Sequence, residues 1–177
     1  MIKFNKEQKV VYTIDIKLYL CYTFTMRINY IEYSIATNSL DIFFAGCRNR
    51  CKDCYNADLM DFENGTYYKE WLPKISHYLQ NFQPLINRIF LVGGSPNHQD
   101  EEEMEDFLST LKQDYPSIPI YAFCGEEIEN VNNTLKAYCD KIKTGAYIPN
   151  LKVDDNIQDG IKLATSNQRI LCKGRDY

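Results

Sequence analysis

The chain has 177 residues, of which 45% are apolar, and this is enough for one domain with a full hydrophobic core. Its net charge of −4 argues against nucleic acid or an anionic membrane as a partner, since both require a basic face. No segment approaches the roughly 18 consecutive apolar residues of a membrane span, and no signal-peptide cleavage site follows residues 9–24. We therefore expect a soluble, cytoplasmic protein.

Residues 1–25 carry no recognisable loop motif, and we expect an N-terminal extension there, either an edge strand or a flexible arm. Residues 26–177 are expected to form one domain. Within it, short apolar runs end at glycine or cysteine and alternate with stretches whose apolar residues recur at helical spacing. The expected strands are residues 40–46, 88–92, 118–123 and 140–145, and the expected helices are residues 68–82, 100–115 and 126–138.

The helix expected at 100–115 has the clearest signals, because Asp100 and Glu103 form a start signal and Pro116 ends the pattern. Residues 150–177 are rich in turn-forming residues, so they are expected to form loops, with room for one short last strand near Ile170 and Leu171.

Regular alternation of strands and helices predicts an α/β fold with parallel strands joined by right-handed crossovers. In such a sheet the carboxyl ends of the strands open on one edge, where ligands bind. Four unusual pieces of sequence each follow an expected strand and should therefore meet at that edge. They are the cysteine loop at 47–54, Gly93-Gly94, Cys124-Gly125 and Thr144-Gly145.

The cysteine loop has the pattern C-x3-C-x2-C, formed by Cys47, Cys51 and Cys54. In a reducing compartment, thiols this close together are usually metal ligands. Three alternatives remain open: a zinc site, a four-cysteine cluster, and a [4Fe-4S] cluster held at three irons with the fourth iron free to bind a small molecule. The first would need His77 or His98 as a fourth ligand, and the second would need Cys124, Cys139 or Cys172.

Several motifs, taken in order, resemble those of radical S-adenosylmethionine (SAM) enzymes, and within them the activating proteins of anaerobic ribonucleoside-triphosphate reductases. The resemblance implies a small partial (β/α) barrel with parallel strands and an open lateral face. It runs from about Met26 to Leu171 and is carried by "AGCRNRCKDCYN", "VGGSP", "DKIKTGAYIPNLK" and "SNQRIL".

The same resemblance implies that Cys47, Cys51 and Cys54 hold a [4Fe-4S] cluster whose open iron binds SAM. One electron, from a donor such as flavodoxin, would then cleave SAM to methionine and a 5′-deoxyadenosyl radical, and this radical would form a glycyl radical on a large reductase subunit. The implied SAM contacts are Asp53, Cys54, Tyr55, Gly93, Gly94 and Ser95, with Cys124 near the ribose and Thr144 and Gly145 near the adenine.

Ser95 stands where these proteins usually carry an acidic residue, so the exact SAM contacts differ from the family pattern. Two other functions remain open. One is a radical SAM enzyme that acts on a small molecule or a peptide. The other is a non-catalytic interaction module that carries zinc or an iron-sulfur cluster.

Overall fold

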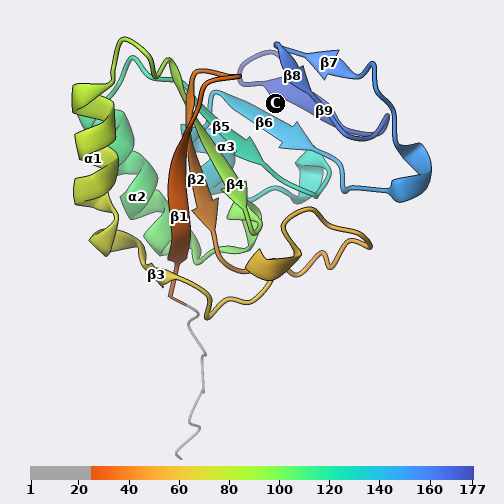
Figure 1. Ribbon diagram of the computed structural model, residues 1–177, viewed down its shortest axis with the longest axis horizontal. Coiled ribbons are helices and arrows are strands. Elements are labelled where there is room, and N and C mark those ends of the chain that lie inside the picture. The colour runs from red at the N-terminus through yellow and green to blue at the C-terminus, as the bar shows by residue number, and fades with distance from the viewer. Residues whose placement is uncertain (1–24) are drawn as a thin grey trace, which may run out of the picture.

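The computed structural model describes residues 25–177, so the extension expected at residues 1–25 lies, except for its last residue, outside the described residues. The described chain forms a seven-stranded sheet in the order β3-β1-β2-β4-β5-β6-β9 (Figure 1). The strands of this sheet are β1 (Arg27–Ser34), β2 (Ser39–Phe44), β3 (Thr66–Tyr67), β4 (Arg88–Gly93), β5 (Ile120–Phe123), β6 (Lys141–Thr144) and β9 (Arg169–Cys172).

The four central strands, β2, β4, β5 and β6, pair in parallel, which confirms the α/β class. The sheet is antiparallel at both margins, where β1 pairs with β2, β3 with β1, and β9 with β6. In the described residues β3 and β9 are the two edges of this sheet and do not pair with each other, so no closed barrel forms. The expected parallel strands are therefore present in an open mixed sheet, while the partial-barrel form stays a prediction. Strands β1 and β3 were not predicted.

Three helices lie on one face of the sheet: α1 (Leu72–Asn81), α2 (Glu101–Asp114) and α3 (Asn133–Tyr138) (Figure 1). Helix α2 begins as predicted, because the Asp100 side chain accepts a hydrogen bond from the Glu103 N–H at 3.0 Å. Its apolar face is buried in a core that also includes Ile42 and Leu91 of the sheet. The buried residues of this face are Met104, Phe107, Leu108 and Leu111. None of the described helices is long and apolar enough to cross a membrane.

The prediction of a helix at residues 126–138 is wrong for the first half of that range. The structure has a 3-10 turn at Ile128–Asn130, and α3 starts only after Asn132, whose side chain accepts a hydrogen bond from the Leu135 N–H at 2.8 Å. The apolar spacing that suggested a longer helix is real, since Val131 and Leu135 are both buried. The residues just after β5 are therefore a loop at the carboxyl edge of the sheet.

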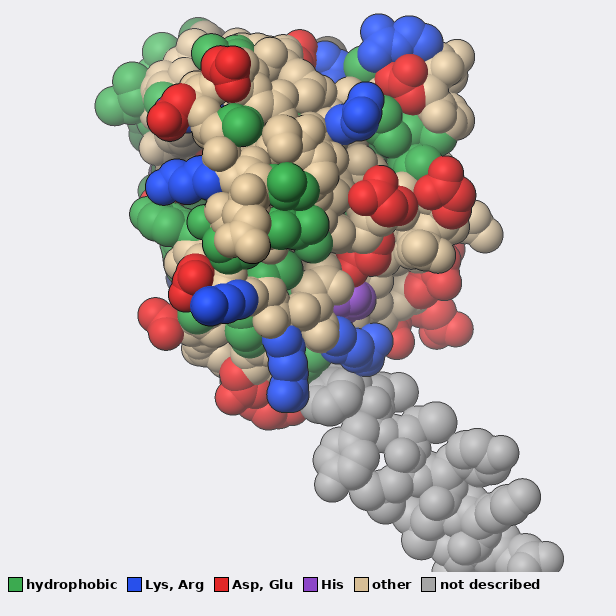
Figure 2. All heavy atoms as spheres, turned by 90° about the vertical axis from the view of Figure 1, so that its right-hand side faces the viewer, with side chains coloured by type: hydrophobic (Ala, Val, Ile, Leu, Met, Phe, Trp, Pro, Cys, Tyr) green, Lys and Arg blue, Asp and Glu red, His purple; other side chains and the backbone are tan. Residues whose placement is uncertain are grey.

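The C-terminal segment covers part of the helix-free face of the sheet. It includes the hairpin β7 (Ile157–Gln158) and β8 (Ile161–Lys162), which was not predicted, and the last strand β9, which was. Ile161, Leu163 and Ile170 form a second, smaller core with Phe90 and Tyr121 of the sheet. Figure 2 views the molecule from the side on which this segment lies in Figure 1, and hydrophobic side chains there alternate with Lys, Arg, Asp and Glu.

Candidate metal centre

The cysteine loop, the double glycine and the turn after β5 meet at one cavity of about 200 Å³ at the carboxyl edge of the parallel strands. This confirms the expectation that signals far apart in the sequence converge, although Thr144 and Gly145 do not line the cavity. Lining residues from these three segments include Cys47, Cys51, Cys54, Gly93, Gly94, Ser95, Cys124 and Gly125.

The backbone of the cysteine loop uses conformations that most residues avoid. Arg50 has φ +45° and Asp53 has φ +57°, both in the left-handed region. The Cys54 N–H donates to the Cys51 carbonyl oxygen at 3.3 Å, which closes a tight turn that contains Asp53. These reversals turn the chain back on itself, so that all three cysteines line the same cavity.

The double glycine is held against the start of the cysteine loop. The Gly94 N–H donates to the Phe44 carbonyl at 2.7 Å, and the Ser95 N–H donates to the Gly46 carbonyl at 2.9 Å. The buried Gln99 amide adds hydrogen bonds to the carbonyls of Ala45 at 2.9 Å and Ser95 at 3.0 Å. The close packing of these two segments explains why position 94 requires glycine. The predicted contact of Gly93, Gly94 and Ser95 with SAM stays a prediction.

The three loop cysteines are free and half-buried, and their thiols influence one another. Burial raises the pKa of Cys54, and the nearby thiols of Cys51 and Cys47 add to this rise. At Cys47 burial also opposes the thiolate, but the contact with His98 lowers its pKa below the usual range. Thiolates at such a site would repel one another, and a bound cationic metal core would relieve that repulsion.

The donor set fits an iron-sulfur cluster. The three thiols lie around one cavity, as a cluster with several irons requires, and sulfur ligands from a short loop are typical of iron-sulfur proteins.

Neither histidine is available as a fourth ligand in this arrangement. The His98 Nδ1 accepts a hydrogen bond from the Arg48 N–H at 3.0 Å, and its Nε2 lies 2.9 Å from the Glu126 Oε1. His77 lies on α1 and is exposed, with its Nδ1 3.2 Å from the Asn81 amide nitrogen. The zinc alternative therefore gains no support from the positions of these side chains.

His98 and Glu126 form a half-buried pair behind the cysteine loop. Burial opposes the imidazolium, but contacts with Cys47 and Glu126 raise the pKa of His98 to about 9. Burial also opposes the carboxylate, but His98 and Asn49 lower the pKa of Glu126 to about 2. Because the Arg48 N–H needs a free lone pair on Nδ1, the geometry corresponds to the neutral imidazole with its proton on Nε2, and the charged form requires that contact to open.

Lys143 lines the same cavity, and the sequence analysis did not single it out. Its Nζ donates to the Gly145 carbonyl at 2.7 Å and to the Cys124 carbonyl at 3.4 Å. Burial lowers the pKa of Lys143 to about 8, although nearby thiols and carboxylates oppose the decrease. The sequence did offer a signal for Lys143. In a strand successive side chains point to opposite faces, so Lys141 and Lys143 share the face opposite to the buried Ile142.

A second cavity, of about 490 Å³, adjoins the first and shares Cys54, Phe123 and Lys143 with it. It extends toward the C-terminal segment, and Asp53 and Tyr55 line it, so all six predicted SAM contacts lie on the two adjoining cavities. Tyr55 is 99% exposed, so its ring is not held by packing.

The remaining expectations concern the cysteines outside the loop and the pair Thr144-Gly145. Cys124 is fully buried and lines the 200 Å³ cavity, and its contact with the ribose stays a prediction. Cys139 is fully buried in the main core, whereas Cys172 is half-exposed and lies 3.4 Å from the Arg175 guanidinium, and neither of these two lines the cavity. Thr144 and Gly145 line neither cavity, so their contact with adenine remains untested.

Comparisons with known proteins agree with this chemistry. The chain is 29% identical over 114 residues to the anaerobic ribonucleoside-triphosphate reductase-activating protein of Enterobacteria phage T4, which covers 62% of this chain and 71% of that protein. No solved structure matches the chain. The sequence model of the 4Fe-4S single cluster domain matches residues 38–171, most of the chain, and this span includes all three loop cysteines. The chain therefore belongs to the family of 4Fe-4S single cluster domains.

Proposed function

We propose that this protein is a radical SAM activating enzyme that generates a glycyl radical on an anaerobic ribonucleoside-triphosphate reductase. The observation that carries the proposal is that Cys47, Cys51 and Cys54, all from one loop, line one cavity with the double glycine. Cys124 lines the same cavity, but it is fully buried, and burial raises the pKa of its thiol well above the usual range, which disfavours the thiolate that a fourth ligand would have to supply. The similarity to a phage T4 protein that bears this activity in its name supports the choice of partner.

In this proposal the three thiolates hold a [4Fe-4S] cluster and leave one iron open. When bound, the cluster and SAM supply a one-electron cleavage of the sulfonium, which yields methionine and a 5′-deoxyadenosyl radical that takes a hydrogen atom from a glycine of the partner. The protein positions both groups, because the fixed contact between the cysteine loop and Gly94 sets the distance from the thiolates to the adjoining 490 Å³ cavity.

The walls of the two cavities suit a cofactor that carries several charges. Phe123 and Tyr147 line both cavities and limit the access of water. Lys143 brings a positive charge to the same place, which offsets the negative charge of three thiolates. Asp53 and Tyr55 would contact SAM where the second cavity begins.

The partner is a large subunit, and the helix-free face of the sheet offers it access. Over β1 and β2 this face carries Tyr30, which stacks on Phe43 with ring centroids 4.1 Å apart and is 37% exposed. We place the reaction in the cytoplasm, where reduced thiols and a flavodoxin-type electron donor are available.

The test is anaerobic reconstitution with iron and sulfide, followed by dithionite and SAM. Release of 5′-deoxyadenosine is expected, and a glycyl radical should appear by electron paramagnetic resonance when the reductase subunit is added. An intact cluster without SAM cleavage would contradict the proposal and favour a non-catalytic cluster module. Cleavage without a glycyl radical would favour an enzyme that acts on a small molecule or a peptide.

A further inference from the structure

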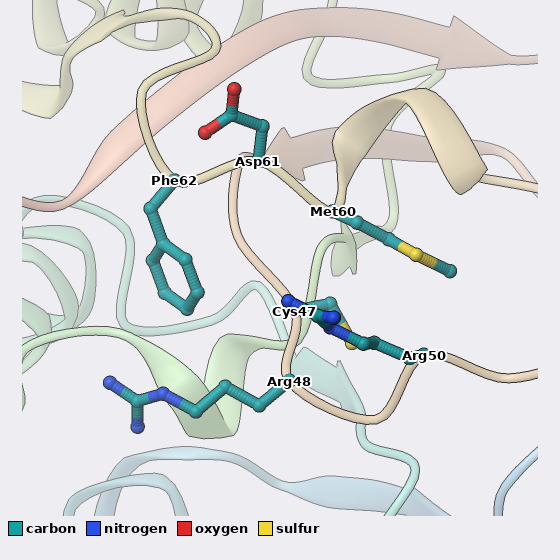
Figure 3. A pocket seen from close by; sticks show the side chains of 6 residues that line it. All are labelled: Cys47, Arg48, Arg50, Met60, Asp61 and Phe62. Atoms are coloured by element: carbon teal, nitrogen blue, oxygen red, sulfur yellow. The ribbon is translucent and has the colours of Figure 1, made fainter.

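A third cavity, of about 670 Å³, lies beside the cysteine loop and is separate from the two cavities described above. Among the described residues, Cys47 is the one residue that lines both this cavity and the 200 Å³ cavity. Figure 3 shows the third cavity with its lining residues, Cys47, Arg48, Arg50, Met60, Asp61 and Phe62.

We propose that this third cavity is the docking site of the electron donor, an acidic protein that carries one electron at a time. The inference rests on the proposed function, because a reductant has to reach the cluster only if the cluster acts in redox chemistry. It adds the place of docking and the residues that recognise the donor.

The charge of the cavity supports an acidic partner. Arg48 and Arg50 are exposed at its rim, and Lys52 follows two residues later, in a chain whose net charge is −4. Asp61 is the one acidic residue among those that line the cavity. Local positive charge on an acidic protein attracts an acidic partner to this place and repels it elsewhere.

The apolar part of the cavity gives the partner a surface to bury. Met60 and Phe62 are half-buried, and Figure 3 shows them on opposite sides of Cys47. The Arg48 guanidinium lies 5.2 Å from the centre of the Phe62 ring, which orders this long side chain at the rim. An adaptable methionine and an aromatic ring within a charged rim are the usual composition of a protein interface.

The position of Cys47 gives the electron a short route. One electron leaves the reduced donor and one enters the cluster, and no atom or proton needs to be transferred between the two proteins. The Cys47 sulfur would be bonded to the cluster, while the same residue lines the cavity in which the donor docks. The 490 Å³ cavity, which is proposed to take SAM, shares no lining residue with the third cavity. The donor and SAM would therefore be able to occupy the protein at the same time.

The experiment uses the cluster-loaded protein and purified flavodoxin as the probe. Two variants are made, the double variant Arg48→Glu/Arg50→Glu and the single variant Met60→Glu. We expect flavodoxin to bind each variant about tenfold or more weakly at low salt, with a flatter salt dependence for the double variant. Release of 5′-deoxyadenosine driven by reduced flavodoxin should fall in parallel, while release driven by dithionite should persist.

A matched control applies the same change of charge on another surface. Lys69 and Lys74 are exposed near α1, and the double variant Lys69→Glu/Lys74→Glu should bind flavodoxin as the wild type does. The docking site would be refuted by unchanged binding in both cavity variants, or by a slower reaction explained by a changed cluster potential at unchanged affinity. Failure of the wild type to cleave SAM with dithionite would instead refute the proposed function, and the binding measurement separates these two results.

Discussion

Gly94 lies directly against Gly46, at the point where the end of β4 meets the start of the cysteine loop. A Cβ atom on Gly94 would lie 2.4 Å from the Gly46 carbonyl oxygen, far inside van der Waals contact. The same carbonyl accepts the Ser95 N–H at 2.9 Å. The position of the cysteine loop relative to the sheet is therefore set by two backbones that touch.

The first prediction is that Gly94→Ala damages the cysteine site as well as the fold. The added methyl group overlaps backbone that cannot move without shifting the loop, so we expect a loss of about 1–3 kcal/mol in the free energy of unfolding. The variant should also retain less iron after reconstitution. Urea denaturation of the metal-free protein and iron analysis measure the two effects.

Gly160→Ala is the control for general instability. Gly160 has φ +74° with open space around it, so alanine there costs about 1–2 kcal/mol through backbone strain alone. This variant should keep its full iron content. Equal iron retention in the Gly94 and Gly160 variants would show that the contact with Gly46 does not position the cysteine loop.

The second prediction separates the ligand cysteines from a packing cysteine. Cys51→Ala should abolish the visible absorption of the cluster and its iron, because a thiolate ligand is removed. Cys139 is fully buried in the main core, so Cys139→Ala should keep the cluster but lose about 1 kcal/mol of stability through the small cavity it leaves. The reverse result, cluster lost at Cys139 and kept at Cys51, would refute the ligand assignment.

The third prediction concerns the pair of His98 and Glu126 beside the cysteine loop. Glu126→Ala leaves the His98 Nε2 half-buried without its carboxylate, which should cost about 1–3 kcal/mol in the metal-free protein. The Arg48 N–H, which donates to the other ring nitrogen, should then exchange its hydrogen faster. Glu127→Ala, at an exposed neighbouring position, is the control and should change neither.

Unchanged exchange at Arg48 in the Glu126 variant would mean that the carboxylate does not hold the imidazole in place. The stability and the exchange rate are measured on the same metal-free sample, so the result does not depend on reconstitution.

The fourth prediction is a pH dependence of stability that arises at Asp41 on β2. Burial raises its pKa from 3.8 to about 6, with Glu32 adding to the rise and a hydrogen bond from Ser39 opposing it. Because the folded state holds the proton more tightly than the unfolded state, this group lowers the free energy of unfolding as pH rises from about 4 to 6.

Asp41→Asn removes this titration and keeps the acceptor for Ser39. The variant should gain stability relative to the wild type between pH 4 and pH 7, as measured by urea denaturation at each pH. Parallel pH profiles of the two proteins would contradict this prediction, because they would show that the pKa of Asp41 is the same in the folded and the unfolded protein.

The parallel part of the fold could be predicted because its signals are local. Three of the four central strands, β2, β4 and β5, are short apolar runs followed closely by a glycine or cysteine, and α2 starts with a capping aspartate. Strand β6 (Lys141–Thr144) was marked by the Gly145 that follows it. The convergence of the three cysteines with Gly93-Gly94 then follows from the geometry of a parallel sheet.

The elements and contacts that were not predicted from the sequence depend on contacts between distant residues. Strand β1 mixes polar and apolar residues because it lies near the margin of the sheet, and its pattern is interrupted by an irregularity between Ile28 and Tyr30. The hairpin of β7 and β8 has strands of only two residues each, which is too short to show the alternation of apolar and polar residues that predicts a strand. The pairing of His98 with Glu126 joins loops after two different strands, and no local pattern marks it.

The most direct test of the central claim is Mössbauer spectroscopy of the reconstituted protein with and without SAM. Three cysteine ligands leave one iron with an open position, so SAM should change the signal of one iron of the four and leave the other three nearly unchanged. A spectrum that does not respond to SAM, or a protein that holds one zinc ion in place of a cluster, would contradict the account.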